Sequence, residues 1–431
     1  MLFLFVFFRA GATRLRVPCA LFLCAAPLFA QAEGETIAQS LFGDLQRMVF
    51  QVRVIDNGSG DQYSLGSGFQ VSADGLVATN YHVVSAYVDE PEKYRLEILN
   101  AAGAKLPVSL QAIDVIHDLA IVRSDALGSD FLQLAQEPLG KGVRIYSIGN
   151  PLDLGMTIIE GTYNGLVKRS RYQKILFSGS LNSGMSGGPA VRENGRVVGV
   201  NVAKGGEQIS FLVPAARLHK LLTAAAQKPA GENFHAQIRG ELMADQQAFT
   251  DELLAAPFES KVLGELTIPL NLHQALRCWG HSDSKEEDRH ESVHQHCRSD
   301  DNIFIAGDLT VGSFHYDAEW IETKELNPLQ FYRFLESRYT PSSLGGSQAK
   351  KHVTEYECQT DFVQLQGVTW KSTACFRAYK KFEGLLDGLL VMAMVESRNK
   401  AAIIKVAASG FTIENTLALF REVMGSLEWK R

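Results

Sequence analysis

The sequence predicts an all-β barrel or sandwich in the first half of the chain and an α+β domain in the second half. Many short strands of alternating hydrophobicity, separated by turn signals, occupy the first half. The second half combines strands with separate helical segments. The length of 431 residues exceeds what one hydrophobic core usually fills, so two or more domains are expected.

The strands of the first half are predicted from period-two hydrophobicity. Apolar residues alternate from Met48 onward, and turn signals such as Asn57-Gly58 follow. A helical pattern from Pro214 to Ala225 ends this half. The further predicted strands are Leu76–Thr79, Arg95–Leu99, Leu106–Ala112, Pro189–Arg192 and Val197–Asn201.

A segment without periodicity, residues 227–233, is the expected linker, and residues 234–431 are the expected C-terminal domain. Helical patterns cover Phe234–Leu254 and Asn327–Tyr339, and Thr412 is placed to cap a final helix. The predicted apolar stripe of that helix is Ile413, Leu417, Phe420 and Met424. The predicted strands are Ile303–Ala306, Phe362–Leu365, Thr369–Tyr379, Leu389–Val395 and Ala402–Ala407.

Residues 1–32 have the pattern of a secretory signal peptide. A basic region that includes Arg9 precedes the apolar run Val17–Ala30, and Ala30-Gln31-Ala32 has the form of a cleavage site. The alternative is an uncleaved membrane anchor, which the extra apolar patch Leu2–Phe8 keeps open. We expect cleavage, a mature start near Glu33 and no membrane span in the mature protein.

The cysteines indicate an oxidising compartment. Two of the six, Cys19 and Cys24, fall within the expected signal peptide. The remaining four, Cys278, Cys297, Cys358 and Cys375, allow three disulfide pairings. We favour the sequential pairing, Cys278–Cys297 with Cys358–Cys375, in a bacterial periplasmic or secreted protein. The net charge of −6 gives no reason to expect binding to nucleic acid.

Four histidines lie between Cys278 and Cys297: His281, His290, His294 and His296. The spacing of Cys278 to His281, and of His294 and His296 to Cys297, permits a zinc site. The alternative is a polar loop closed by a disulfide. We favour the loop and no metal, because oxidised cysteines do not bind zinc.

Three short segments carry the residue types of nucleophilic catalysis. His82 lies in Thr79–Val84, Asp118 in His117–Val122 and Ser186 in Gly184–Pro189. A serine hydroxyl needs a base within hydrogen-bond reach, and a neutral histidine can take its proton near neutral pH. A carboxylate can orient the histidine ring, and the Gly184 and Ser186 amides can form an oxyanion hole.

Each of these residues also has a structural interpretation. The Ser186 segment reads as a glycine-rich turn, His82 as a core histidine and Asp118 as a strand-capping carboxylate. Asp114 is a nearby rival for the acid. The joint order of the three segments favours the catalytic interpretation.

These segments resemble the trypsin-like, chymotrypsin-fold serine proteases, and most closely their bacterial HtrA/Deg branch. The resemblance runs from about Leu45 to Leu222 and includes Ser147–Pro151, Ile159–Gly161 and Ile209–Pro214. It implies a protease domain at residues 33–226, built as two six-stranded β-barrels with the active site between them. It also implies that His82, Asp118 and Ser186 are the triad.

Two departures from the family pattern limit this resemblance. Met185 stands where the family has Asn or Asp, so we expect altered packing of the loop rather than inactivity. No Gly-Leu-Gly-type carboxylate-binding loop follows the linker, so no PDZ domain is recognisable.

We therefore expect a serine endopeptidase that acts on proteins or peptides without a cofactor, and protein quality control would fit the family. The alternative is a chaperone-like or binding protein whose site is latent or poorly assembled. A third hypothesis is a latent protease whose cleft the C-terminal domain covers. Oligomeric state is left open.

Overall fold

The structure is a computed structural model, and it describes residues 35–226, 233–270, 272–284, 289–340 and 349–429. The expected signal peptide lies outside the described residues, as does the expected linker except for Asn233. Residues from Ile37 onward form one compact unit. No helix among the described residues is long and apolar enough to cross a membrane.

An antiparallel sheet of seven strands forms the first part of the unit, after helix α1 (Ile37–Leu45) and the 3-10 turn η1 (Gln46–Met48). Its strand order is β5-β4-β1-β2-β3-β7-β6. The strands are β1 (Val49–Asp56), β2 (Gln62–Gln70), β3 (Leu76–Thr79), β4 (Tyr94–Leu99), β5 (Lys105–Pro107), β6 (Ser109–Asp114) and β7 (Leu119–Arg123).

A closed barrel of six strands follows, in the order β10-β13-β12-β11-β8-β9. The 3-10 turn η2 (Pro151–Asp153) interrupts it, and helix α3 (Ala215–Ala225) ends it. Its strands are β8 (Arg144–Gly149), β9 (Thr157–Leu166), β10 (Ile175–Ser178), β11 (Pro189–Val191), β12 (Val197–Gly206) and β13 (Ile209–Pro214).

The expectation of two six-stranded barrels is met in strand number by the second barrel only. The first sheet has a seventh strand because the segment expected as one strand, Leu106–Ala112, is divided into β5 and β6. Pro107 ends β5, and it has no backbone N–H with which to continue the ladder. The short β5 therefore adds only an edge to the sheet.

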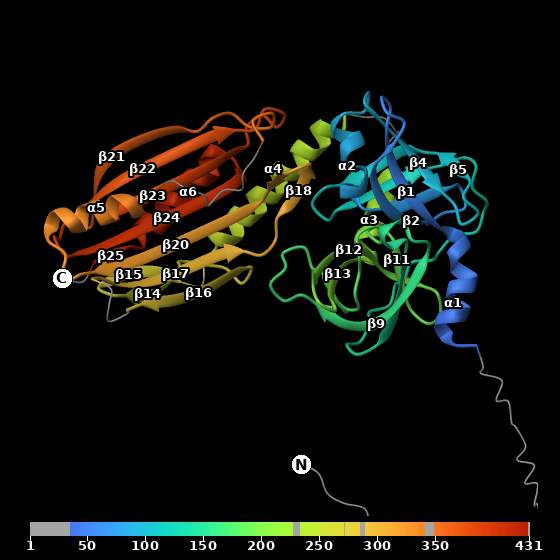
Figure 1. Cartoon of the computed structure of the whole chain (residues 1–431), viewed down its shortest axis with the longest axis horizontal. Helices are drawn as coiled ribbons and strands as arrows, with labels where there is room; N and C mark the ends of the chain where they lie inside the picture. Colours follow the sequence, from blue (N-terminus) through green and yellow to red (C-terminus); the bar gives the residue numbers. More distant parts are fainter. Residues whose placement is uncertain (1–34, 227–232, 271, 285–288, 341–348, 430–431) are drawn as a thin grey trace, which may run out of the picture. The chain divides into compact units, whose positions relative to one another are not determined.

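The second half is built on another antiparallel sheet of seven strands, in the order β16-β17-β20-β24-β23-β22-β21 (Figure 1). These strands are β16 (Leu276–Asp283), β17 (Glu291–Ser299), β20 (Ser313–Glu322), β21 (Glu357–Leu365), β22 (Val368–Ala378), β23 (Leu386–Met394) and β24 (Lys400–Phe411). Two smaller sheets contain β14 (Glu259–Leu263), β15 (Leu266–Leu270) and β25 (Glu428–Trp429), and β18 (Ile303–Ala306) and β19 (Leu309–Val311).

Three helices accompany these sheets: α4 (Phe234–Leu253), α5 (Pro328–Arg338) and α6 (Ile413–Gly425). Side chains cap all three at their N-termini, through Asn233, Asn327 and Thr412. The predicted apolar stripe of α6 is wrong in part. Leu419, Phe420 and Val423 are buried there, whereas Ile413 is exposed, because the helix faces the sheet about one residue away from the predicted stripe.

The segment between Cys278 and Cys297, which we expected to be a polar loop, is mostly strand. Ser282 and Asp283 end β16, Glu291 begins β17, and residues 285–288 lie outside the described residues.

Two disulfides are present, Cys278–Cys297 and Cys358–Cys375, and each joins residues that face one another on adjacent strands. This is the sequential pairing that we favoured from the sequence.

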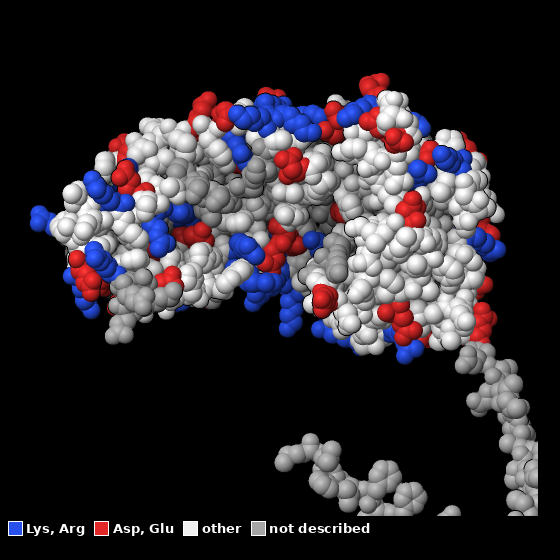
Figure 2. All heavy atoms as spheres, viewed as in Figure 1, with Lys and Arg blue, Asp and Glu red and all other residues white. Residues whose placement is uncertain are grey.

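On the face drawn in Figure 2, acidic and basic side chains are interspersed on a mainly uncharged surface.

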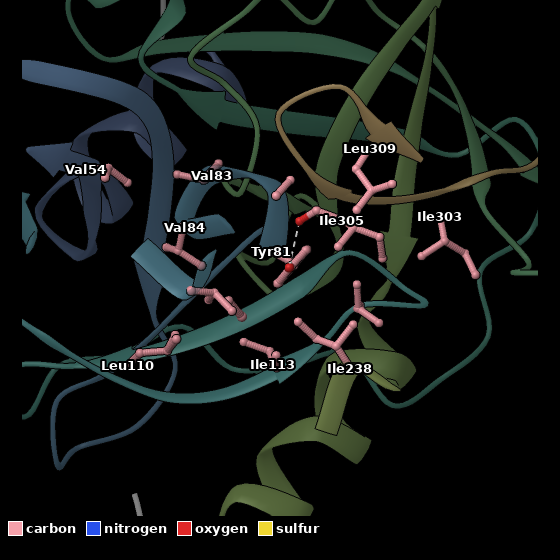
Figure 3. Close-up of a cluster of buried hydrophobic side chains, with 14 of the residues drawn as sticks. Val54, Tyr81, Val83, Val84, Leu110, Ile113, Ile238, Ile303, Ile305 and Leu309 are labelled. Atoms are coloured by element: carbon pink, nitrogen blue, oxygen red, sulfur yellow. Dashed lines mark hydrogen bonds between the residues drawn. The ribbon is translucent and has the colours of Figure 1, made fainter. Parts of the chain in front are cut away.

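One hydrophobic cluster extends from the first sheet into the second half of the chain (Figure 3). It joins Val54 of β1 and Val84 of helix α2 (Tyr81–Asp89) to Ile238 of α4 and to Ile305 of β18. The buried hydroxyl of Tyr81 donates a hydrogen bond of 2.8 Å to the carbonyl of Ile305. The β18–β19 hairpin is therefore packed into the core beside α2.

A buried ion pair makes a second connection between the halves. Arg171, in the connection between β9 and β10, pairs with Asp245 of α4 at 3.2 Å, and both side chains are about nine-tenths buried. The guanidinium also lies over the ring of Phe249, at 3.9 Å from its centroid. A buried charge that loses its partner is strongly destabilising.

We therefore expect Asp245→Ala to lower the free energy of unfolding by about 3 kcal/mol, because it leaves Arg171 buried without its main counter-charge. Urea unfolding followed by tryptophan fluorescence measures this change. Asp251→Ala is the matched control, since Asp251 is an exposed carboxylate on the same helix. Equal stability of the two variants would contradict the assigned role of the ion pair.

Candidate active site

His82 is the second residue of α2, and the carboxylate of Asp118 holds it in two places. Its ring Nδ1 lies 2.7 Å from Oδ2 of Asp118, and its backbone N–H donates to Oδ1 over 2.8 Å. A carboxylate can only accept, so Nδ1 carries the hydrogen of this bond. The neutral ring then presents Nε2 as a proton acceptor.

Asp118 lies immediately before β7 in a strained backbone conformation. Its φ of 56° falls in the left-handed region that few residues other than glycine adopt. The side-chain amide of the buried Asn80 donates to the Asp118 carbonyl over 2.7 Å. The rival acid, Asp114, contacts a different histidine, because its carboxylate accepts from the ring of His117 at 2.8 Å. Of the two acids, Asp118 is the one paired with His82.

The Ser186 loop depends on glycines on both sides of the serine. Gly184 and Gly187 have φ values of 94° and 87°. A Cβ at Gly184 would lie 2.3 Å from the carbonyl oxygen of Asn150, and one at Gly187 would lie 2.1 Å from that of Ser67. Larger residues are therefore excluded at both positions by strain and by space.

Ser67 of β2 attaches this loop to the first sheet. Its backbone N–H donates to the Ser186 carbonyl and its hydroxyl donates to the Gly184 carbonyl, each over 2.7 Å. Because Ser67 is fully buried, these bonds do not compete with water. These bonds fix the position of the Ser186 loop relative to the first sheet. His82 follows β3 of this sheet, and Asp118 immediately precedes β7.

Met185 points into the second barrel. Its side chain is fully buried and packs with Ile145, Phe177 and Leu212. The expectation that methionine changes the packing of this loop relative to the family stays a prediction. A flexible apolar side chain fills the space beneath the nucleophile loop, where a polar residue would need hydrogen-bond partners.

The Ser186 hydroxyl donates its hydrogen bond to the carbonyl of Val202, over 2.8 Å. A hydroxyl has one hydrogen to donate, so this bond competes with the one to His82 that nucleophilic attack requires. The structure thus pairs two of the three predicted triad residues, His82 and Asp118, and leaves Ser186 bonded elsewhere. Among the described residues, the backbone amides of Gly184 and Ser186 have no hydrogen-bond acceptor, and their role as an oxyanion hole stays a prediction.

A cavity of about 350 Å³ opens at His82 and Asp118, and part of its wall comes from the second half of the chain. Asn302, Ile303 and Phe304, at the start of β18, line it. The Phe304 ring meets the His82 ring edge-on, with centroids 6.3 Å apart. Ile303–Ala306 was predicted as a strand, but no sequence pattern indicated that this strand lies beside His82.

Comparison with known proteins finds relatives of the first half of the chain. Residues 66–200 match the trypsin-like peptidase domain family. Serine protease HTRA1 of Xenopus tropicalis is 32% identical over 167 residues, which are 36% of this chain and 35% of that protein. Serine protease HTRA4 of Mus musculus is 29% identical over 221 residues, 49% of this chain and 40% of that protein. The chain thus spans about two fifths or less of the length of these relatives.

The crystal structure of the serine endoprotease from Yersinia pestis also matches, with a TM-score of 0.41 and 24% identity over 46% of this chain and 70% of that chain. Residues 66–200, which match the trypsin-like peptidase domain family, contain His82, Asp118 and Ser186. Residues 66–200 are therefore similar to trypsin-like peptidase domains, and this part of the chain is similar to the HtrA serine proteases within that class.

Asp118 sets the basicity of His82. Burial by itself lowers the pKa of His82, but the charge of Asp118 and its hydrogen bond outweigh burial and raise this pKa above its usual value. Asp118→Asn removes the charge and leaves the burial, so we expect the pKa of His82 to fall below its wild-type value. Asparagine tolerates the left-handed backbone, so the variant should fold.

An NMR titration of the His82 ring measures this shift. Asp114→Asn is the control, because Asp114 pairs with His117 and not with His82. A wild-type pKa of His82 in Asp118→Asn, or an equal shift in both variants, would show that Asp118 does not act on His82.

Proposed function

We propose that this protein is a serine endopeptidase that hydrolyses peptide bonds through an acyl-enzyme. The observation that carries the proposal is the contact of Asp118 with both the ring and the backbone of His82, in a domain that matches the trypsin-like peptidases. Ser186 is the nucleophile, and the amides of Gly184 and Ser186 bind the oxyanion. The chemistry needs no cofactor.

In the proposed reaction, His82 Nε2 takes the hydroxyl proton as Ser186 Oγ bonds to the scissile carbonyl carbon. The amides stabilise the negative charge that develops on the carbonyl oxygen. The C–N bond then breaks, and His82 gives the proton to the leaving amine. Water, activated by His82, hydrolyses the ester, releases the second product and restores the Ser186 hydroxyl.

We also propose that the conformation of the active site in this structure is that of a latent protease. Two observations favour latency: the Ser186 hydroxyl is bonded to Val202, and Phe304 lies against His82 in the catalytic cavity. Activation requires the serine to exchange the Val202 carbonyl for His82 and the cavity to admit a peptide. The same observations are compatible with a chaperone-like or binding protein whose site never assembles, and protein cleavage separates the two functions.

The proposed compartment is a bacterial periplasm or the cell exterior, and the proposed substrates are proteins or peptides. The signal-like residues 1–32 and the two disulfides support export. A role in protein quality control rests on the relation to HtrA proteases alone.

Ser186→Ala should abolish cleavage of an unfolded protein such as reduced casein, with a loss of about 10⁴-fold or more. Ser183→Ala is the matched control, since Ser183 is an exposed serine of the same loop. Gel electrophoresis of the digest measures the rate. Cleavage that survives in Ser186→Ala would reject the mechanism, and the absence of cleavage in wild type and also in Phe304→Ala would favour the binding protein.

Phe304→Ala should raise the rate of cleavage several-fold, because it removes the ring beside His82 and widens the cavity. Phe362→Ala, which changes an exposed phenylalanine of β21, should leave the rate unchanged. The initial rate on a fluorogenic peptide is the measurement. A rate no higher than wild type in folded Phe304→Ala would contradict latency through this contact.

A further inference from the structure

Three histidines converge on one face of the sheet in the second half of the chain. His281 lies on β16 directly opposite His294 of β17, and His296 is two residues further along the same strand. Their ligand nitrogens all lie within 4.8 Å of one another. The rings of His281 and His294 are stacked, with centroids 4.3 Å apart and planes 5° apart.

The disulfide changes the interpretation of this cluster. Cys278 and Cys297 are bonded to each other, so neither can bind a metal. Residues two apart on a strand share a face, whereas Cys297 follows His296 and points to the opposite face, where it is buried in the core. The histidines therefore form a group of their own, apart from the cysteines with which the sequence associated them.

A carboxylate is available as a fourth ligand. Oδ2 of Asp283 lies 3.8 Å from Nε2 of His281 and 3.8 Å from Nε2 of His294. Asp283 follows His281 by two residues on β16, so both side chains lie on the face of the cluster.

The ring of His296 is oriented as a metal ligand would be. Its Nδ1 lies 2.8 Å from Oδ1 of Asp317 on the adjacent strand β20. Because the carboxylate can only accept, Nδ1 carries a hydrogen and Nε2 keeps the lone pair. Histidines that bind metals commonly donate their other nitrogen to a carboxylate in this way.

The cluster lines a hollow of about 310 Å³ that contains charges of both signs. Glu319 lies 3.6 Å from Nε2 of His294 and pairs with Arg338 of α5 at 3.2 Å, so that cation is already neutralised. Lys405 also lines the hollow. Three carboxylates, Asp283, Asp317 and Glu319, face these two cations, and the excess of acid favours a bound cation.

We propose that His281, His294 and His296, with Asp283, bind a divalent transition-metal ion such as Zn²⁺. Imidazole nitrogens and a carboxylate are ligands that zinc takes in tetrahedral sites, at about 2.0–2.2 Å. Closing the site requires the nitrogens to approach within about 3.4 Å of one another, as that geometry dictates. The side chain of His281 is 53% exposed, which leaves it room to turn toward the ion, whereas the side chain of His294 is only 8% exposed and holds its position.

Isothermal titration calorimetry of the purified full chain with zinc chloride tests this site. The protein is first treated with EDTA and dialysed, without a reductant, so that the Cys278–Cys297 disulfide stays intact. We expect one saturable site for each chain in the wild type. His281→Ala should weaken zinc binding by at least about tenfold, because one of the protein ligands is lost.

Two further variants make the result decisive. His219→Ala, which removes an exposed histidine of α3 in the protease half, should bind zinc as the wild type does. His294→Ala should abolish both binding and the rise in melting temperature that a ligand of the folded state produces. His281→Ala changes an exposed side chain, so its fold is retained even if His294→Ala fails to fold. Wild-type protein that shows no saturable binding, or wild-type affinity in His281→Ala, would overturn the proposal.

Discussion

The start of helix α2 is the constraint on which the active site and the second half of the chain both depend. Two consecutive residues there make the decisive contacts: Tyr81 donates to the carbonyl of Ile305, and His82 is held by Asp118. The first contact attaches the helix to the β18–β19 hairpin, and the second positions the candidate base. A shift of the hairpin would therefore act on the residue next to His82, through a buried helix whose side chains leave little room for independent movement.

The β18–β19 hairpin is firmly packed against helix α2. A latent protease would therefore need an activating signal to move the hairpin away from His82. Ile303, Ile305, Leu309 and Val311 are each at most 3% exposed within the shared cluster. Burying one aliphatic side chain of this size contributes roughly 1.5–3 kcal/mol, so withdrawing the hairpin would cost several kcal/mol. A substrate or partner can shift the equilibrium toward the conformation with the hairpin withdrawn only by binding that conformation more tightly. The bond of Ser186 to Val202 is cheaper to exchange, since one hydrogen bond replaces another.

Local patterns predicted the strands and helices that bury one face, but they predicted few of the contacts between distant residues. The motif order identified the Asp118–His82 pair, and the glycines around Ser186 proved sterically necessary. β16 and β17 escaped prediction because polar residues occupy both faces near His281 and His294, so no hydrophobic alternation marks them. The place of Phe304 beside His82 is a contact across 222 residues of sequence, and no local pattern encodes such a contact. The hydroxyl direction of Ser186 likewise depends on Val202, which the loop sequence does not contain.

The most direct test of the central claim is to map the residue that a fluorophosphonate probe modifies. Such a probe reacts with a serine only where a base and an oxyanion hole act together. Wild-type protein and Phe304→Ala would be labelled, digested and sequenced by mass spectrometry. The account predicts an adduct on Ser186 that forms faster in Phe304→Ala. No adduct on Ser186 in either folded protein would contradict it, and the chain would then be a binding protein with a protease fold.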